Sequence, residues 1–121
     1  MIRLGIDQAL AKSGFAVMDD DSLVCSGLIK TKTGESVGSK LKSIYDDVNR
    51  LIDEYNPQVM IIEDTYLLMK SKNRGIDGDS NVDTLKKLNQ VRGVVTLTAA
   101  QRGIPLEVYA ATTAKKAVTG S

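Results

Sequence analysis

Four consecutive apolar residues, Val59 to Ile62, constrain the fold of this chain more than any other stretch. The run does not alternate between apolar and polar side chains, as a strand with one face in water does, so it predicts a strand that is covered on both faces. It ends in two acids, Glu63 and Asp64. A helical pattern precedes the run and another follows it, which favours an α/β domain containing parallel strands.

The first residues of the chain predict a second strand that also ends in an acid. Residues 2–7 alternate aliphatic and other side chains, so one face is apolar and Asp7 lies on the opposite face. Gly5, on the same face as Asp7, has no side chain that could crowd it. Asp7 has two readings at this point. It ends the strand because Asp is poor in strands and common in turns, or it is a rigidly held ligand for a metal or phosphate.

Residues 14–18 and 23–29 predict two further strands, so the chain begins as an antiparallel meander. The segment Asp19–Ser22 lies between them and contains three consecutive acids. A cation site would need ligands that converge from several segments, so we interpret this segment as a hairpin turn.

Two long helices are predicted by apolar residues at helical spacing. The first begins at Ser39 and ends at Asn56, before Pro57, and the second runs from about Val82 to Arg102. Gly93 within the second helix suggests that a neighbouring element approaches closely there. The expected apolar face of this helix, which Val94 and Leu97 widen, consists of Val82, Leu85, Leu88, Val91, Val95 and Thr98 or Ala99. It either packs on the sheet alone or serves both the sheet and a partner subunit. Residues 106–109 predict a last strand, before a short helix that carries Lys115 and Lys116.

A strand, a helix and a strand in succession form a crossover with a parallel pair of strands. This arrangement would bring Asp7 and Glu63 to the same carboxyl edge of the sheet, where open α/β sheets place their sites. Two neighbouring carboxylates repel each other unless a cation lies between them, so the pair favours a divalent metal site. The alternative is that one of the two acids is only an exposed residue at the end of a strand.

A locally basic segment follows the second acidic strand end. Tyr66 is followed by Lys70, Lys72 and Arg74, a pattern that suits single-stranded or distorted nucleic acid, because a ring can stack on a base while cations bind phosphates. The alternative is a solvated loop. Residues 77–81 resemble a calcium loop only faintly, because Val82 and Leu88 stand where the loop glycine and the bidentate Glu belong.

Composition excludes several kinds of chemistry. The chain has no histidine, which excludes Ser-His and Cys-His catalysis and most zinc sites, and its single cysteine, Cys25, excludes an internal disulfide. The net charge of +1 gives no overall attraction to nucleic acid. Neither a secretory signal nor a membrane-spanning apolar run is apparent, so we expect a cytoplasmic protein with no membrane partner.

Several stretches together resemble the RuvC family of Holliday junction resolvases, and the resemblance runs nearly from end to end. The resemblance implies a ribonuclease H-like fold: a mixed sheet of three antiparallel strands followed by parallel strands, with flanking helices. The matching stretches are Gly5-Ile6-Asp7, Gly14, Ser26–Thr31, Ile62-Glu63, Val91–Val94, Ala99–Pro105 and Lys115–Gly120.

The resemblance also implies a function: a homodimeric, Mg²⁺-dependent endonuclease that nicks four-way DNA junctions symmetrically, with Mn²⁺ as a possible substitute and branch-migration proteins as possible partners. Asp7 and Glu63 match the first two catalytic carboxylates and would bind the metal. Tyr66 matches an aromatic residue that stacks in the opened junction. Lys115 matches a basic residue near the scissile phosphate. The expected DNA contacts are Tyr66, Lys70, Lys72, Arg74 and Lys116.

The chain departs from the family pattern in three places. Gln8 replaces the usual proline, the loop after Tyr66 is longer, and the last two catalytic aspartates of the family lie on a helix beyond Ser121. We therefore expect residues 1–121 to form a single domain that lacks the family's last helix. We expect this domain to bind branched DNA but to cleave it weakly. The alternatives are a non-catalytic junction-binding module of the same fold, and a sugar-kinase-like or actin-like phosphate-binding fold.

Overall fold

The structure is a computed structural model that describes residues 1–7, 12–63 and 78–109. Five strands form one mixed sheet with the order β3-β2-β1-β4-β5. The strands β1, β2 and β3 pair antiparallel, whereas β4 pairs parallel with both β1 and β5. The elements are β1 (Ile2–Asp7), β2 (Lys12–Asp19), β3 (Ser22–Lys30), α1 (Val37–Tyr55), β4 (Val59–Glu63), α3 (Gly78–Gln101) and β5 (Leu106–Tyr109).

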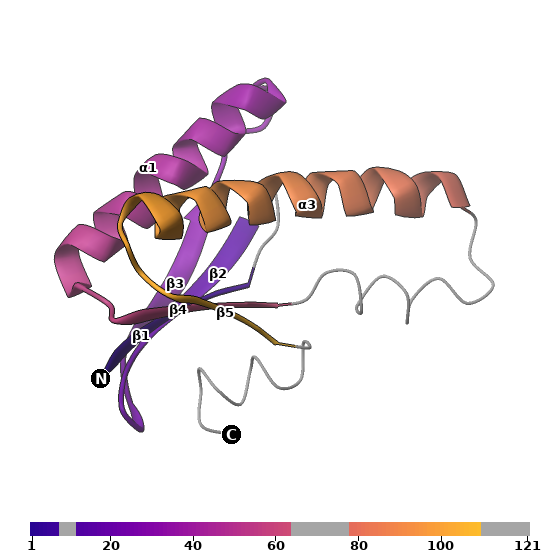
Figure 1. Ribbon diagram of the computed structural model, residues 1–121. Coiled ribbons are helices and arrows are strands. Elements are labelled where there is room, and N and C mark those ends of the chain that lie inside the picture. Colours follow the sequence, from indigo (N-terminus) through magenta and orange to yellow (C-terminus); the bar gives the residue numbers. More distant parts are fainter. Residues whose placement is uncertain (8–11, 64–77, 110–121) are drawn as a thin grey trace.

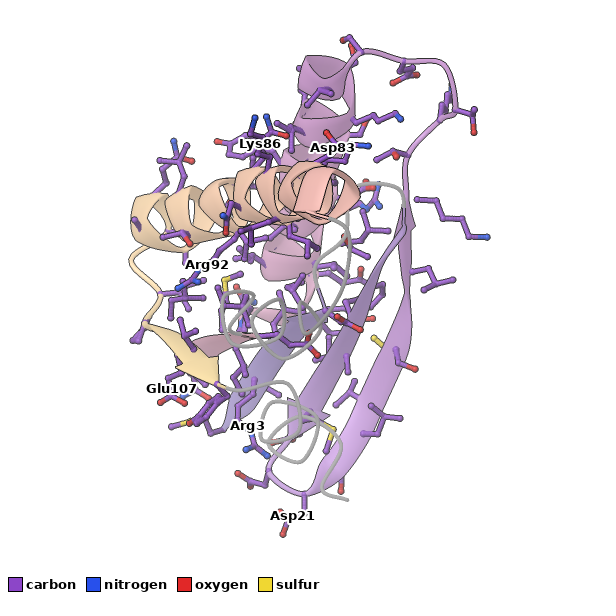
Figure 2. The ribbon with its side chains drawn as sticks, turned by 90° about the vertical axis from the view of Figure 1, so that its right-hand side faces the viewer. Arg3, Asp21, Asp83, Lys86, Arg92 and Glu107 are labelled. Atoms are coloured by element: carbon purple, nitrogen blue, oxygen red, sulfur yellow. The ribbon has the colours of Figure 1, made fainter. Side chains whose placement is uncertain are left out.

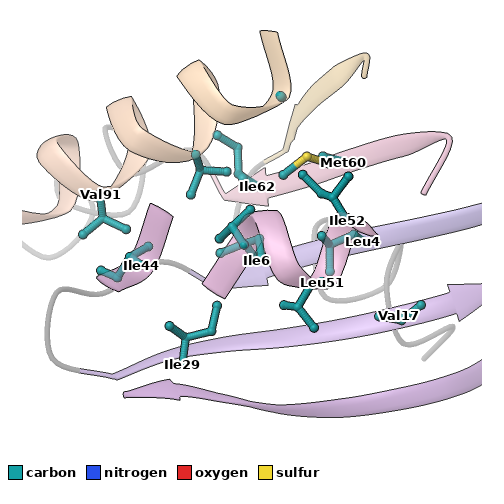
Figure 3. Close-up of a cluster of buried hydrophobic side chains, with 13 residues drawn as sticks. Leu4, Ile6, Val17, Ile29, Ile44, Leu51, Ile52, Met60, Ile62 and Val91 are labelled. Carbon is teal, nitrogen blue, oxygen red and sulfur yellow. The ribbon is translucent and has the colours of Figure 1, made fainter. Parts of the chain in front are cut away.

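Helices α1 and α3 contact each other and lie on the same side of the sheet (Figure 1). The core lies between these helices and the sheet (Figure 3). It takes alternate residues from each of four strands, as the period of two in a strand requires. The cluster consists of Leu4, Ile6, Val17, Ile29, Ile44, Val48, Leu51, Ile52, Met60, Ile62, Val91, Val95 and Ala99. We call the side of the sheet opposite α1 and α3 the open face, after its exposed part at the ends of β1 and β3, where Asp7 and Leu28 are exposed to solvent; Met18, Val59 and Ile61, on the same side, are buried.

Local signals set the ends of the elements. The Ser36 Oγ accepts a hydrogen bond from the Ser39 N–H at 3.2 Å and caps the start of α1. Asn56 ends this helix in the left-handed conformation, with its N–H bonded to the Ile52 carbonyl at 2.8 Å, and Pro57 follows. Gly103 ends α3 with a φ of 66°, a conformation that glycine adopts without strain.

The three acids lie at the hairpin turn between β2 and β3, as the sequence indicated. Asp20 has a φ of 51°, and its carboxylate accepts a hydrogen bond from the Met1 ammonium at 2.8 Å. Arg3 donates a hydrogen bond to the Asp20 carbonyl at 2.6 Å. The ammonium holds the pKa of the Asp20 carboxyl below its usual range. Figure 2 shows Asp21 at the tip of this hairpin. The turn therefore fastens the start of β1 to the end of β2.

A polar cluster fixes the end of α3 against α1. The Tyr45 hydroxyl donates a hydrogen bond to Gln101 Oε1 at 2.7 Å, and Arg102 donates to Asn49 Oδ1 at 3.1 Å. Arg102 also forms an ion pair with Asp53. These contacts join positions about fifty residues apart in sequence and so hold both helices in one orientation over the sheet.

The structure corrects the expected bounds of several elements. Helix α3 begins at Gly78, four residues before the expected Val82, and α1 begins at Val37 rather than at Ser39. Strand β2 begins at Lys12 and β3 ends at Lys30. Polar and small residues carry no apolar period, so the pattern of apolar residues does not mark the ends of helices and strands that consist of them.

Leu97, at the margin of the expected apolar face of α3, is 53% exposed and does not belong to the core, because Val91, Val95 and Ala99 face the sheet and Leu97 lies on another side of the helix. One expectation about α3 is wrong. Gly93 was expected at a close contact, but a Cβ atom built at this position has no atom within 4 Å among the described neighbours. Among the described residues, no close contact therefore explains why position 93 is a glycine.

We expect Gly93→Ala to stabilise the protein by about 0.5–1 kcal/mol, because alanine loses less backbone entropy in a helix and meets open space here. Urea unfolding followed by circular dichroism measures this change. A clear loss of stability would instead indicate that another chain packs against this side of α3.

Within the part of the chain that the structure describes, neither helix is long and apolar enough to cross a membrane.

Candidate active site

The two acids predicted as metal ligands lie on neighbouring parallel strands. Ile6 of β1 is in register with Ile62 of β4, so the next residues, Asp7 and Glu63, are neighbours at the carboxyl ends of these strands. Ile6 and Ile62 both face the helices in the core. Since side chains alternate along a strand, Asp7 and Glu63 both face the open side, on backbones about 4.8 Å apart. The predicted juxtaposition is confirmed.

The surroundings of the two carboxylates differ. Glu63 is 8% exposed, whereas Asp7 is exposed to solvent. Asp7 pairs with Gly14 of β2, and a Cβ atom built at Gly14 would lie 3.6 Å from the Asp7 Cβ. Gly5 is the preceding open-face residue of β1. Gly5 is buried, whereas Gly14 is partly exposed and has no side chain, so a group can approach the Asp7 carboxylate from the side of β2.

The donor set fits a hard divalent cation. Carboxylate oxygens are the ligands that Mg²⁺ and Mn²⁺ prefer, and a cation relieves the repulsion between neighbouring acids. Among the described residues, no group of three or more His, Cys, Asp or Glu side chains is placed to hold a metal. Asp7 and Glu63 are therefore two of the residues that could hold such an ion, and further ligands would have to come from elsewhere.

Tyr109 is a residue of this site that the sequence analysis did not name. It is in register with Glu63 and therefore lies on the open face, on the opposite side of Glu63 from Asp7. Its hydroxyl donates a hydrogen bond to Glu107 Oε2 at 2.6 Å, which raises the pKa of Tyr109. Figure 2 shows Glu107 on β5. The sequence contained a signal for Tyr109, because a last strand that runs parallel to residues 59–63 places its final residue beside Glu63.

The other predicted site residues lie outside the described residues. They are Tyr66, Lys70, Lys72, Arg74, Lys115 and Lys116. Their predicted roles stay predictions.

Comparisons with known proteins agree with the geometry. The family model "Crossover junction endodeoxyribonuclease RuvC" matches residues 3–121. The chain is 34% identical over 124 residues to the crossover junction endodeoxyribonuclease RuvC of Prosthecochloris aestuarii, covering 99% of this chain and 60% of that protein. It is 39% identical over 126 residues to that of Gluconobacter oxydans, covering 100% of this chain and 68% of that protein. The chain thus spans about three fifths to two thirds of the length of these relatives.

Solved structures with the same fold include a Thermus thermophilus RuvC in complex with Holliday junction substrate. It superposes with a TM-score of 0.75 at 19% identity and covers 100% of this chain and 70% of that chain. A second structure of Thermus thermophilus RuvC gives a TM-score of 0.69 at 20% identity, over 99% of this chain and 68% of that one. The expected ribonuclease H-like mixed sheet with flanking helices is therefore confirmed.

The match of the family model excludes the sugar-kinase-like reading. A family model that spans residues 3–121, relatives more than 30% identical over nearly the whole chain, and two acids side by side at the ends of β1 and β4 all agree. The chain belongs to the RuvC family of crossover junction endodeoxyribonucleases.

Proposed function

We propose that this protein is a structure-selective endonuclease that cuts four-way (Holliday) DNA junctions by metal-dependent hydrolysis of phosphodiester bonds. The observation that carries the proposal is the pair of carboxylates, Asp7 and Glu63, on adjacent strands of the open face. The family's name describes the same activity. We also propose that the protein acts on this substrate in the cytoplasm.

In the proposed mechanism, Asp7 and Glu63 hold Mg²⁺, or Mn²⁺ in its place. The ion, when bound, polarises the phosphate and lowers the pKa of a bound water. The buried Glu63 is held by its strand and its surroundings and would be the more rigid ligand. Asp7 is exposed to solvent, so a DNA phosphate could approach its carboxylate. Lys115 would neutralise charge that develops on the phosphate, as an electrostatic stabiliser.

The proposed DNA contacts beyond the acids are Tyr66, which would stack on a base of the opened junction, and Lys70, Lys72, Arg74 and Lys116, which would bind phosphates. A homodimer would place paired sites against paired strands of a two-fold junction. The exposed Leu97 on α3 is available for such a contact. Branch-migration proteins are the proposed further partners. We also propose that residues 1–121 form one domain, which binds junctions more readily than it cleaves them.

A binding experiment tests this function without requiring cleavage. Fluorescence anisotropy with a labelled four-way junction, in Ca²⁺ to prevent hydrolysis, should show tighter binding than to a duplex of the same sequence. Tyr66→Ala should reduce the preference for the junction about tenfold, because stacking on one base contributes about 1–3 kcal/mol. Tyr66→Phe, which keeps the ring, is the matched control and should retain the preference.

The outcomes separate the candidate functions. Junction binding with nicking in Mg²⁺ supports the nuclease. Junction binding without nicking, even at high Mg²⁺ or Mn²⁺, supports the alternative of a non-catalytic binding module. Equal or absent binding to junction and duplex contradicts both.

A further inference from the structure

A row of five residues crosses the open face at the level of the acid pair. The registers align Leu28 of β3, Gly14 of β2 and Asp7 of β1, and they continue through Glu63 to Tyr109. The row is apolar at one end, has no side chain at Gly14, and is acidic in the middle. Between Asp7 and β3, a chain-like ligand bound at the acids would therefore cross Gly14, which has no side chain, in the row formed by the described strands.

Leu28 and Lys30 form the far end of this path. Ile29 between them is 3% exposed in the core, so Leu28 and Lys30 face the open side. Leu28 is 51% exposed and lies two residues before the end of β3. β3 is an edge strand, so no other described strand covers this end of the row.

Lys30 is an exposed cation at the same carboxyl edge as Asp7. It forms no ion pair with any residue in the described ranges, unlike Lys42, which pairs with Asp46. Its register partner in β2 is another lysine, Lys12. An exposed lysine without a carboxylate partner is available to bind an anion from outside the protein.

The spacing matches a nucleic-acid backbone. With strands about 4.8 Å apart and a rise of about 3.3 Å per residue, the Cα atoms of Asp7 and Lys30 are about 12 Å apart. Phosphates of one strand rise about 3.4 Å per nucleotide along a duplex axis and lie further apart in an extended strand, so Lys30 reaches a phosphate about two to four nucleotides from one held at the acids.

From this arrangement we propose that the DNA strand flanking the scissile phosphate crosses Gly14 and Leu28 toward β3, and that Lys30 binds a backbone phosphate of that strand. The inference rests on the proposed function and adds to it a direction for the bound strand. Leu28 contacts a sugar or base along the way, Gly14 permits the close approach, and Lys30 fixes the register without reading sequence.

The first test measures junction binding by anisotropy in Ca²⁺ over a series of KCl concentrations. Lys30→Ala should weaken binding about tenfold and lower the slope of log K against log [KCl] by about one per bound protomer, for the loss of one phosphate contact. Lys30→Glu should weaken binding further. Arg50→Ala is the control, because Arg50 is an exposed cation on α1, which covers the other face, and it should leave the slope unchanged.

The second test identifies the phosphate. Neutral methylphosphonates are placed one at a time at the four positions on each side of the cleavage point. The unaltered protein should lose affinity at one position two to four nucleotides away, and Lys30→Ala should be insensitive there. If Lys30→Ala keeps the original salt slope and the same methylphosphonate profile, the inference is wrong. If the unaltered protein does not prefer junctions, the proposed function itself fails.

Discussion

Asp7→Asn is expected to lower the rate of junction nicking in Mg²⁺ by a factor on the order of 10³, because a metal-held phosphate gains several kcal/mol of charge stabilisation in the transition state. The amide keeps the size of the carboxylate but loses its charge, so the fold should be unchanged. Single-turnover cleavage of a labelled junction measures the rate. Asp46→Asn, an exposed acid on α1, is the matched control.

Metal binding gives a readout that does not depend on cleavage. Mn²⁺ binding followed by electron paramagnetic resonance should weaken strongly in Asp7→Asn and in Glu63→Gln, but not in Asp46→Asn. In the metal-free protein Asp7→Asn should also raise the melting temperature slightly, because it removes the repulsion between neighbouring carboxylates. Unchanged Mn²⁺ binding in both site variants would show that Asp7 and Glu63 do not share an ion.

Ile62→Ala is expected to destabilise the protein by about 3–4 kcal/mol, since removal of a buried aliphatic side chain costs both its transfer free energy and a cavity. Ile62 is fully buried and packs in the core between the sheet and the helices (Figure 3). Urea unfolding measures the loss, which should also lower the melting temperature by about 10–20 °C.

Val108→Ala is the matched control for this variant. Val108 is the register partner of Ile62 on β5, but it is 40% exposed. Its truncation should cost less than about 1 kcal/mol. Equal losses for the two variants would contradict the assignment of Ile62 to the core and Val108 to its margin.

Much of this fold followed from local patterns in the sequence. The apolar run from Val59 to Ile62 predicted a covered strand, and all four residues are buried. The alternation of residues 2–7 placed Ile6 in the core and Asp7 on the other face, as observed. These predictions succeed because the period of side chains is fixed by backbone geometry, whatever the strand packs against.

The details of α3 could not be predicted in the same way. Leu97 matches the apolar spacing but is exposed, and Gly93 meets open space rather than a neighbour. A helix with apolar residues on a wide arc can be rotated over the sheet by several angles. The contacts of Tyr45 with Gln101 and of Arg102 with Asn49 and Asp53 join residues distant in sequence, and such contacts fix the angle.

The sequence by itself determined that strands end in Asp7 and Glu63 and that a crossover joins them in parallel, because hydrophobic periodicity and chain connectivity are local properties. Only the tertiary structure decided which side chains surround the acids. The registers of β2 and β5 place Gly14 on one side of the acid pair and Tyr109 on the other. The register of β3 with β2 extends the row to Leu28, two residues before Lys30. Register depends on the packing of the whole sheet, since a shift by one residue would turn every side chain to the opposite face.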